Sequence, residues 1–212
     1  MLQLIKEKYP YFPIIGLLGF LFLFVIATTL YPGGSINEAA SEGYSYFHNF
    51  ICDLMSLNLP KGTQNNARPI AIIAHIMLSF AMISFFYILP EIFSTQNWKT
   101  RLVRAAGMIA MTTFIFMATD YHDIAVTITG VFCTISFIPL FLELINYKNR
   151  VLKALAYLCF FLSVSLFLSY ETKIGFYYAP LLQKITFIFD GIMVIWVSLI
   201  VASKRHLALP FA

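Results

Sequence analysis

The sequence predicts an all-α membrane protein built as a bundle of six transmembrane helices. Of its 212 residues, 60% are hydrophobic and only 11% are charged, whereas about 25% of the residues in a soluble domain are charged. A membrane span needs about 20 apolar residues, and six apolar stretches of about that length occur, none with the alternation of a barrel strand. This composition excludes a disordered chain, a nucleic-acid-binding domain and almost any water-soluble enzyme.

The six spans follow one another in a single membrane domain. We expect them at residues 12–30, 69–93, 102–119, 122–145, 151–170 and 179–202. The first follows Lys6 and Lys8, as in a signal peptide, but its apolar run of about 19 residues exceeds a signal core and no small-residue cleavage site follows it. We therefore expect it to remain as a helix. Only Asp120 and Tyr121 separate the third and fourth spans, which predicts a tight antiparallel hairpin.

Basic residues are distributed unequally between the two sides of the predicted membrane. The side of the termini holds Lys6, Lys8, Lys99, Arg101, Arg104, Lys148, Arg150, Lys153, Lys204 and Arg205. The other side holds Lys61, Arg68, Lys173 and Lys184. Because Lys and Arg concentrate in cytoplasmic loops, we expect both termini in the cytoplasm and the chain in the plasma (inner) membrane.

The connection between the first two spans, residues 31–68, is much longer than the others and predicts structure of its own. A turn rich in Pro and Gly opens it at 31–34. Residues 35–38 then fit a capping box, a hydroxyl followed three residues later by a carboxylate. No proline occurs after it until the polar return to the second span, so we expect one or two helices on the outer face. On such a helix Asn49 and Asp53 share a face.

Ionisable residues inside a membrane cost about 2.5–3.5 kcal/mol each at the helix centre, so their positions are informative. At about 1.5 Å per residue, His75 and Lys184 lie about 9 and 8 Å below the outer surface, and Asp190 lies about 16 Å deep. All candidate residues fall in the outer half: His48, Asn49, Asp53, His75, Asp120, His122, Asp123, Lys184 and Asp190. Together they predict a polar cavity that opens to the outside.

Three interpretations of this polar layer remain open. In the first, His48, His75 and His122 hold a catalytic zinc ion, which usually takes three protein ligands and a water, and the protein hydrolyses a lipid amide or ester. No HExxH or HxxxH spacing accompanies these residues. In the second, the cavity binds a lipid or a small molecule. Gln183 and Thr186 share a helix face with Asp190, which predicts a polar stripe running inward.

The third interpretation is a non-catalytic structural or sensing membrane protein. His75, Lys184 and Asp190 would form a hydrogen-bonded network between helices, since helix packing in lipid lacks a hydrophobic driving force. For the layer as a whole we favour the binding of a membrane lipid or small ligand, with zinc as the cofactor only of the hydrolase alternative. Whether the protein is an enzyme stays open, and nothing in the sequence indicates a nucleic-acid partner.

Two short motifs carry a resemblance to a known family. They are HNFICDL at 48–54 and ATDYHD at 118–123. In these motifs and in its layout the chain resembles the prokaryotic multi-pass membrane proteins grouped as domain of unknown function 998, and more distantly the eukaryotic DRAM-like proteins. The resemblance implies six membrane helices and no assigned activity. It implies candidate functional positions at Asn49, Asp53, Asp120 and His122.

Overall fold

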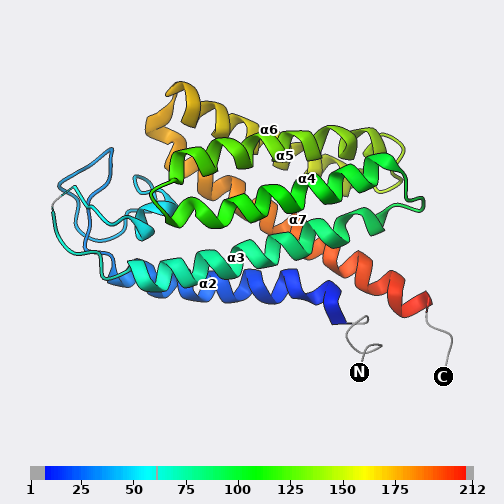
Figure 1. The fold of residues 1–212 in the computed structure, drawn as a ribbon, viewed down its shortest axis with the longest axis horizontal. Coiled ribbons are helices and arrows are strands. Elements are labelled where there is room, and N and C mark those ends of the chain that lie inside the picture. Colours follow the sequence, from blue (N-terminus) through cyan, green and yellow to red (C-terminus); the bar gives the residue numbers. More distant parts are fainter. Residues whose placement is uncertain (1–7, 61, 209–212) are drawn as a thin grey trace.

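The fold is described by a computed structural model that covers residues 8–60 and 62–208. Six long helices run along the long axis of the molecule, and successive helices run in opposite directions (Figure 1). Their bounds are α2 Phe12–Leu30, α3 Arg68–Ile88, α4 Trp98–Phe114, α5 His122–Leu144, α6 Arg150–Thr172 and α7 Ala179–Ala208. The start of α2 and the end of α7 lie at the same end of the bundle, which we call the terminal end. The loop between α2 and α3 lies at the opposite end, which we call the loop end.

All six helices are long and apolar enough to cross a membrane. They match the predicted spans to within six residues. The largest difference is the end of α7, at Ala208 instead of 202, and α3 and α4 end five residues early, each followed by a short 3-10 helix. The start of α4 also differs, at Trp98 instead of 102. The early start of α4 has a local cause. The Oδ1 atom of Asn97 accepts hydrogen bonds from the backbone N–H groups of Lys99 and Thr100, at 2.9 and 3.1 Å. This cap begins the helix in a polar stretch that hydropathy does not detect.

The helices form a ring in which α2 packs on α3, α3 on α4, and α4 on α5, while α6 packs on α7. The contact between α5 and α6 is less extensive, and α7 closes the ring against α2 and α3. Large buried side chains concentrate in the half toward the terminal end. Among them are Val103, Leu144, Leu152, Val197 and Val201. A second, smaller cluster of buried side chains lies at the loop end and includes Ala27, Tyr31, Leu54, Met55 and Ala71.

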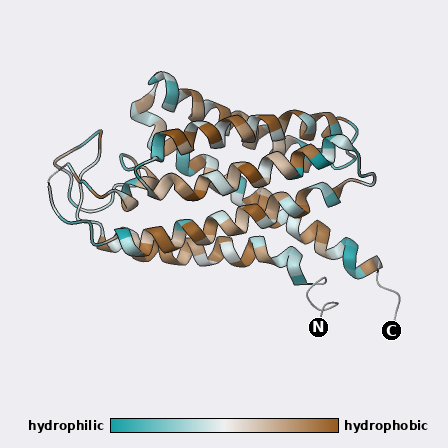
Figure 2. Cartoon of the chain, viewed as in Figure 1, coloured by the Kyte–Doolittle hydropathy of each residue, from teal (hydrophilic) through white to brown (hydrophobic). Residues whose placement is uncertain are grey.

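The outer surface of the ring is apolar over most of its length. Large side chains such as Ile15, Phe22, Phe80, Ile138 and Phe161 are more than half exposed. Figure 2 shows hydrophobic residues along the helices and hydrophilic residues mainly near their ends. Such a surface suits the hydrocarbon of a bilayer. The backbone suits it too, because each helix pairs its own N–H and C=O groups, as lipid requires.

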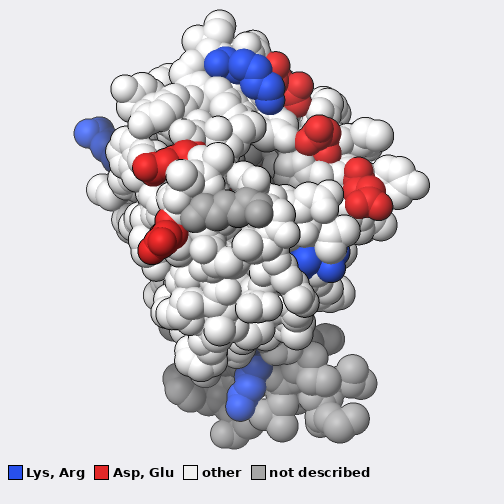
Figure 3. All heavy atoms as spheres, turned by 90° about the vertical axis from the view of Figure 1, so that its left-hand side faces the viewer, with Lys and Arg blue, Asp and Glu red and all other residues white. Residues whose placement is uncertain are grey.

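Charges differ between the two ends. Basic residues of the described chain gather at the terminal end: Lys8, Lys99, Arg101, Arg104, Lys148, Arg150, Lys153, Lys204 and Arg205. Lys6 and Lys61, which entered the predicted distribution, lie outside the described residues. Figure 3 looks onto the loop end, where acidic side chains lie on both sides of the face and basic side chains are also visible. Of the described residues, Glu38, Glu42, Asp53, Asp120, Asp123 and Glu171 belong to this end, with Arg68, Lys173 and Lys184.

The loop between α2 and α3 differs from the prediction, because it is not mainly helical. Its one helical element in the described part is a short 3-10 helix, η2 Ile51–Met55. The expected capping box closes a turn instead. The Oγ atom of Ser35 accepts from the N–H of Glu38 at 2.9 Å, and the Ser35 N–H donates to the Glu38 carbonyl at 3.0 Å. Gly43, with φ of +66°, then bends the chain away.

Candidate functional site

A cavity of about 340 Å³ lies inside the ring, and its lining runs from Cys52 at the loop end to Leu89 and Ala156 near the terminal end. All six helices and η2 contribute side chains to it, and most of these side chains are apolar. The polar ones are Cys52, His75, His122, Thr129, Cys133, Thr134, Cys159, Ser163, Tyr170, Gln183, Thr186 and Asp190. Small-molecule sites are typically about 300–1,000 Å³, mainly apolar, with a few converging polar groups. The cavity is thus more apolar than the polar cavity expected from the sequence.

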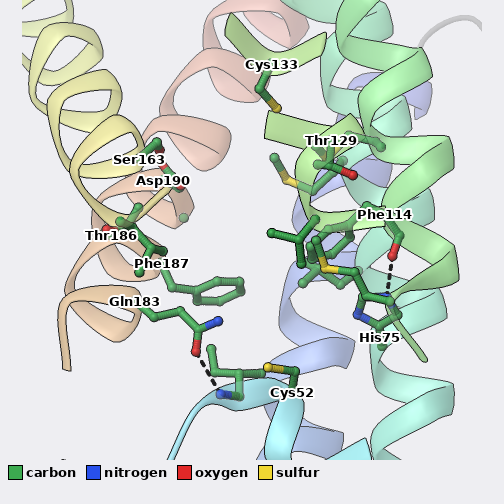
Figure 4. A pocket seen from close by; sticks show the side chains of 18 of the residues that line it. Cys52, His75, Phe114, Thr129, Cys133, Ser163, Gln183, Thr186, Phe187 and Asp190 are labelled. Carbon is green, nitrogen blue, oxygen red and sulfur yellow. Dashed lines mark hydrogen bonds between the residues drawn. The ribbon is translucent and has the colours of Figure 1, made fainter. Parts of the chain in front are cut away.

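One wall carries a polar stripe on α7. Gln183, Thr186 and Asp190 all line the cavity, as their spacing predicted, and Figure 4 shows Ser163 of α6 beside Asp190. The Gln183 side chain is fixed by the loop, since its Oε1 atom accepts the N–H of Ile51 at 2.7 Å. The Thr186 hydroxyl donates to the Leu182 carbonyl of its own helix at 2.9 Å. This stripe leads from η2 at the loop end down to Asp190.

The opposite wall carries His75 and Thr129 (Figure 4). The Nε2 atom of His75 lies 2.7 Å from the carbonyl oxygen of Phe114. A carbonyl can only accept, so Nε2 carries the hydrogen, and in the neutral ring Nδ1 is left as an acceptor. The Thr129 hydroxyl bonds to that of Thr113 at 2.9 Å. His75 therefore has a structural bond and one ring nitrogen available to a bound molecule.

Asp190 is the one carboxylate among the described residues that line the cavity, and none of those residues is Lys or Arg. None of the four ion pairs of the described residues includes it. Its side chain interacts with the thiol of Cys159 on α6. Since Asp190 lies about 16 Å from the start of α7, at about 1.5 Å per residue, this carboxylate is deep inside the apolar zone.

Part of the loop between α2 and α3 covers the cavity. We call this segment, residues 44–55, the roof. At its centre Asn49 is fully buried. Its Nδ2 atom donates to the Gly34 carbonyl and to Oδ2 of Asp53, at 2.8 and 2.9 Å, and its Oδ1 atom accepts from the Ser45 N–H at 3.0 Å. Asn49 and Asp53 thus lie together as predicted, although no regular helix joins them. Lys184 donates to the carbonyl of Asn49 and so ties the roof to α7.

Burial shifts the pKa of several ionisable groups of the roof, among them Asp53 and Cys52. Burial raises the pKa of Asp53, against the opposing effect of its hydrogen bonds from Asn49 and the Phe50 N–H. Burial, together with the nearby Asp53 carboxylate, raises the pKa of the Cys52 thiol to about 12. Because the thiolate is the reactive form, Cys52 is not an activated nucleophile despite its place on the cavity wall.

A small hydrogen-bonded group lies at the rim, between α5 and α6. The Tyr170 hydroxyl donates to Oδ1 of Asp123 at 2.6 Å, and Nδ1 of His122 lies 3.0 Å from the same oxygen. His122 and Tyr170 line the cavity, whereas Asp123 is exposed. Asp120 is exposed nearby on the connection between α4 and α5.

The three histidines proposed as zinc ligands are not brought together. His48 bonds to Glu38 at 2.7 Å and does not line the cavity, His75 bonds to Phe114, and His122 bonds to Asp123. Residues 8–60 and 62–208 contain no group of three or more His, Cys, Asp or Glu side chains that could hold a metal ion. The arrangement of the described residues therefore gives no support to the zinc alternative.

The nine candidate residues thus separate into three sets. His75, His122 and Asp190 line the cavity, Asn49, Asp53 and Lys184 hold the roof, and His48, Asp120 and Asp123 lie toward the surface. The contributions of Thr129, Ser163, Tyr170 and the cysteines were not predicted from the sequence. Single hydroxyls and thiols in apolar helices gave no signal, because such groups usually bond to their own backbone or pack as apolar side chains.

Comparison of the chain with protein-family models, with curated proteins and with solved structures finds no match. The resemblance to the domain of unknown function 998 group therefore stays a prediction. Function is inferred from the cavity and its side chains.

Proposed function

We propose that this chain is an integral membrane protein that binds a mainly apolar small molecule, or an apolar part of a lipid, in its central cavity. The observation that supports this proposal is the cavity itself, which measures about 340 Å³ and is lined mostly by apolar side chains from all six helices. Polar groups are few and are placed on two facing walls.

An apolar cavity that side chains do not fill leaves its lining without dispersion contacts on that side. A purely structural bundle would gain stability by closing this space with larger side chains. A ligand with an apolar body would recover the missing dispersion contacts. Its polar group could reach His75 on one wall or Asp190 on the other.

We further propose that the loop end faces the outside of the plasma (inner) membrane and that both termini are cytoplasmic. The excess of Lys and Arg at the terminal end supports this orientation, because such residues are retained on the cytoplasmic side. In this orientation the roof faces the exterior, and ligands enter from the outer leaflet or the external solution.

The chain offers a matched pair of variants at Gly191, which lines the cavity next to Asp190. A Cβ atom at this position would contact only Leu17 Cδ2, at 3.5 Å, which is an ordinary van der Waals distance. Gly191→Leu therefore fills part of the cavity, whereas Gly191→Ala changes the same position and leaves most of the space.

A photoactivatable probe tests the proposal on the full chain in liposomes. With a diazirine-bearing decanol, we expect crosslinks on cavity residues of α5 and α7, found by peptide mass spectrometry. These crosslinks should be lost in Gly191→Leu and kept in Gly191→Ala. Crosslinks confined to lipid-facing side chains such as Phe22 and Phe161 in the wild-type protein would overturn the proposal.

A further inference from the structure

The cavity contains an electrostatic feature that binding of an apolar molecule does not explain. A carboxylate in the centre of a membrane helix costs about 2.5–3.5 kcal/mol on insertion scales. Such residues usually pair with a cationic or hydrogen-bonding group. Asp190 occupies such a position on α7, and its side chain faces the cavity (Figure 4).

The nearest cationic side chain along α7 serves another role. Lys184 donates to the carbonyls of Asn49 and Pro180, so its ammonium group is directed to the roof. The two histidines of the cavity are also engaged, His75 with the Phe114 carbonyl and His122 with Asp123. The described part of the chain therefore supplies no cation to Asp190.

The surroundings of Asp190 combine hydrogen-bond acceptors with aromatic rings. Ser163 of α6 and Thr186 of α7 lie on the same wall, and each carries a hydroxyl oxygen that can accept a hydrogen bond. Phe187 on the same helix also lines the cavity, and its ring centroid lies 5.0 Å from that of Phe20 on α2. A cavity whose lining includes a carboxylate and aromatic rings is a favourable environment for an organic cation.

We propose that the cavity selects a protonated amine that carries an apolar group, with the ammonium at Asp190 and the apolar group toward the aromatic and aliphatic walls. This inference rests on the proposed function and names the chemical class of its ligand. Each N–H of the ammonium can donate to the Asp190 carboxylate or to the hydroxyls of Ser163 and Thr186. Charge-assisted hydrogen bonds of this kind are the stronger ones in a medium of low dielectric constant.

Two probes of equal length separate this inference from the proposed function. A diazirine-bearing decylamine is protonated at pH 7, as a lysine side chain is, while the diazirine-bearing decanol is neutral. Crosslinking of cavity peptides in liposomes is measured against probe concentration. Each value is normalised to crosslinking of lipid-facing peptides in the same sample, which corrects for partitioning of the probe into the bilayer.

In the wild-type protein we expect half-saturation by the amine at a concentration at least about tenfold below that for the alcohol, a difference of about 1.4 kcal/mol. Asp190→Asn should weaken crosslinking by the amine far more than crosslinking by the alcohol, and so remove this difference. Asp120→Asn makes the same chemical change on an exposed side chain and should retain wild-type selectivity.

The outcomes are distinct. Equal half-saturation by both probes in the wild-type protein overturns the amine inference and leaves the proposed function intact. Absence of cavity crosslinks with either probe overturns the proposed function itself. If Asp190→Asn fails to fold, a third probe, a diazirine-bearing decanoate, is used on the wild-type protein instead of the variant. The order amine, then alcohol, then carboxylate supports the inference, and any other order contradicts it.

Discussion

The imidazole Nε2 atom of His75 lies 2.7 Å from the carbonyl oxygen of Phe114, and this hydrogen bond joins α3 to α4. Phe114 is the last residue of α4, where the helix changes to the 3-10 helix η4, Ile115–Ala118. Carbonyls at the end of an α-helix lack a regular intrahelical partner, and the hydrocarbon core of a membrane contains no water to replace it. The bond therefore explains a buried histidine in an apolar helix without any metal.

Replacement of His75 by Phe keeps a ring of similar size and removes the donor. We expect the free energy of unfolding to fall by about 1–3 kcal/mol, the cost of leaving a buried acceptor unpaired. His75→Gln retains an N–H donor and should lose less. The measurement is equilibrium unfolding by SDS in mixed micelles, followed by circular dichroism. Equal stability of His75→Phe and the wild-type protein would show that the Phe114 carbonyl does not depend on this bond.

The raised pKa of Asp53 predicts a pH dependence of stability. The folded protein holds the Asp53 proton to a higher pH than the unfolded chain, whose carboxyl has an ordinary pKa of 3.8. Unfolding then releases a proton between the two pKa values. The free energy of unfolding contributed by this group therefore falls as pH rises from about 4 to the folded pKa, and is constant above it.

Asp53→Asn isolates this contribution. The amide oxygen can still accept from the Phe50 N–H and from Asn49, whose bonds to Asp53 are both 2.9 Å long, but the side chain no longer ionises. We expect the stability of the variant minus that of the wild-type protein to grow as pH rises through the window and then to level off. Unfolding in mixed micelles across this pH range measures it. A difference that stays constant with pH would contradict a raised pKa.

The polar stripe and the zinc hypothesis show what a sequence can and cannot predict here. Gln183, Thr186 and Asp190 lie on one helix, where the period of 3.6 residues fixes their common direction. Hydropathy places His75 and His122 at definite depths in their helices but does not determine which way each helix is rotated. That rotation depends on packing between helices, which carries His75 to the Phe114 carbonyl and His122 to Asp123.

The prediction of helices in the loop was wrong for a related reason. Ser35 and Glu38 have the spacing of a capping box, but a hydroxyl at that position can equally close a turn, and the residues after it decide between the two. Here Gly43 and the buried Asn49 direct the chain over the cavity. The contacts that hold the roof join residues far apart in sequence, such as Ile51 and Gln183. No local pattern encodes them.

Close packing of the ring predicts opposite effects of alanine at two glycines. A Cβ atom at Gly107 of α4 would overlap the ring of Phe86 on α3. Gly107→Ala should therefore lower the free energy of unfolding by about 1–3 kcal/mol, as overpacking does. At Gly191 a Cβ atom meets only Leu17 Cδ2, at an ordinary van der Waals distance, so Gly191→Ala should be neutral or stabilising by up to about 1 kcal/mol, through helix propensity. Unfolding in mixed micelles compares the two, and equal losses would contradict the difference in packing.

The proposed orientation is tested by single cysteines at the two ends of the bundle. Glu42→Cys places a thiol on the exposed loop, and Lys148→Cys places one on the exposed connection between α5 and α6. With a membrane-impermeant maleimide on intact cells, we expect labelling of Glu42→Cys alone, and labelling of Lys148→Cys only after permeabilisation. The wild-type protein gives the background. That background should be low at Cys52, because a thiol of pKa about 12 is almost fully protonated at neutral pH. The reverse pattern would place the loop end in the cytoplasm, and the cavity would then receive its ligand from the inner leaflet or the cytosol.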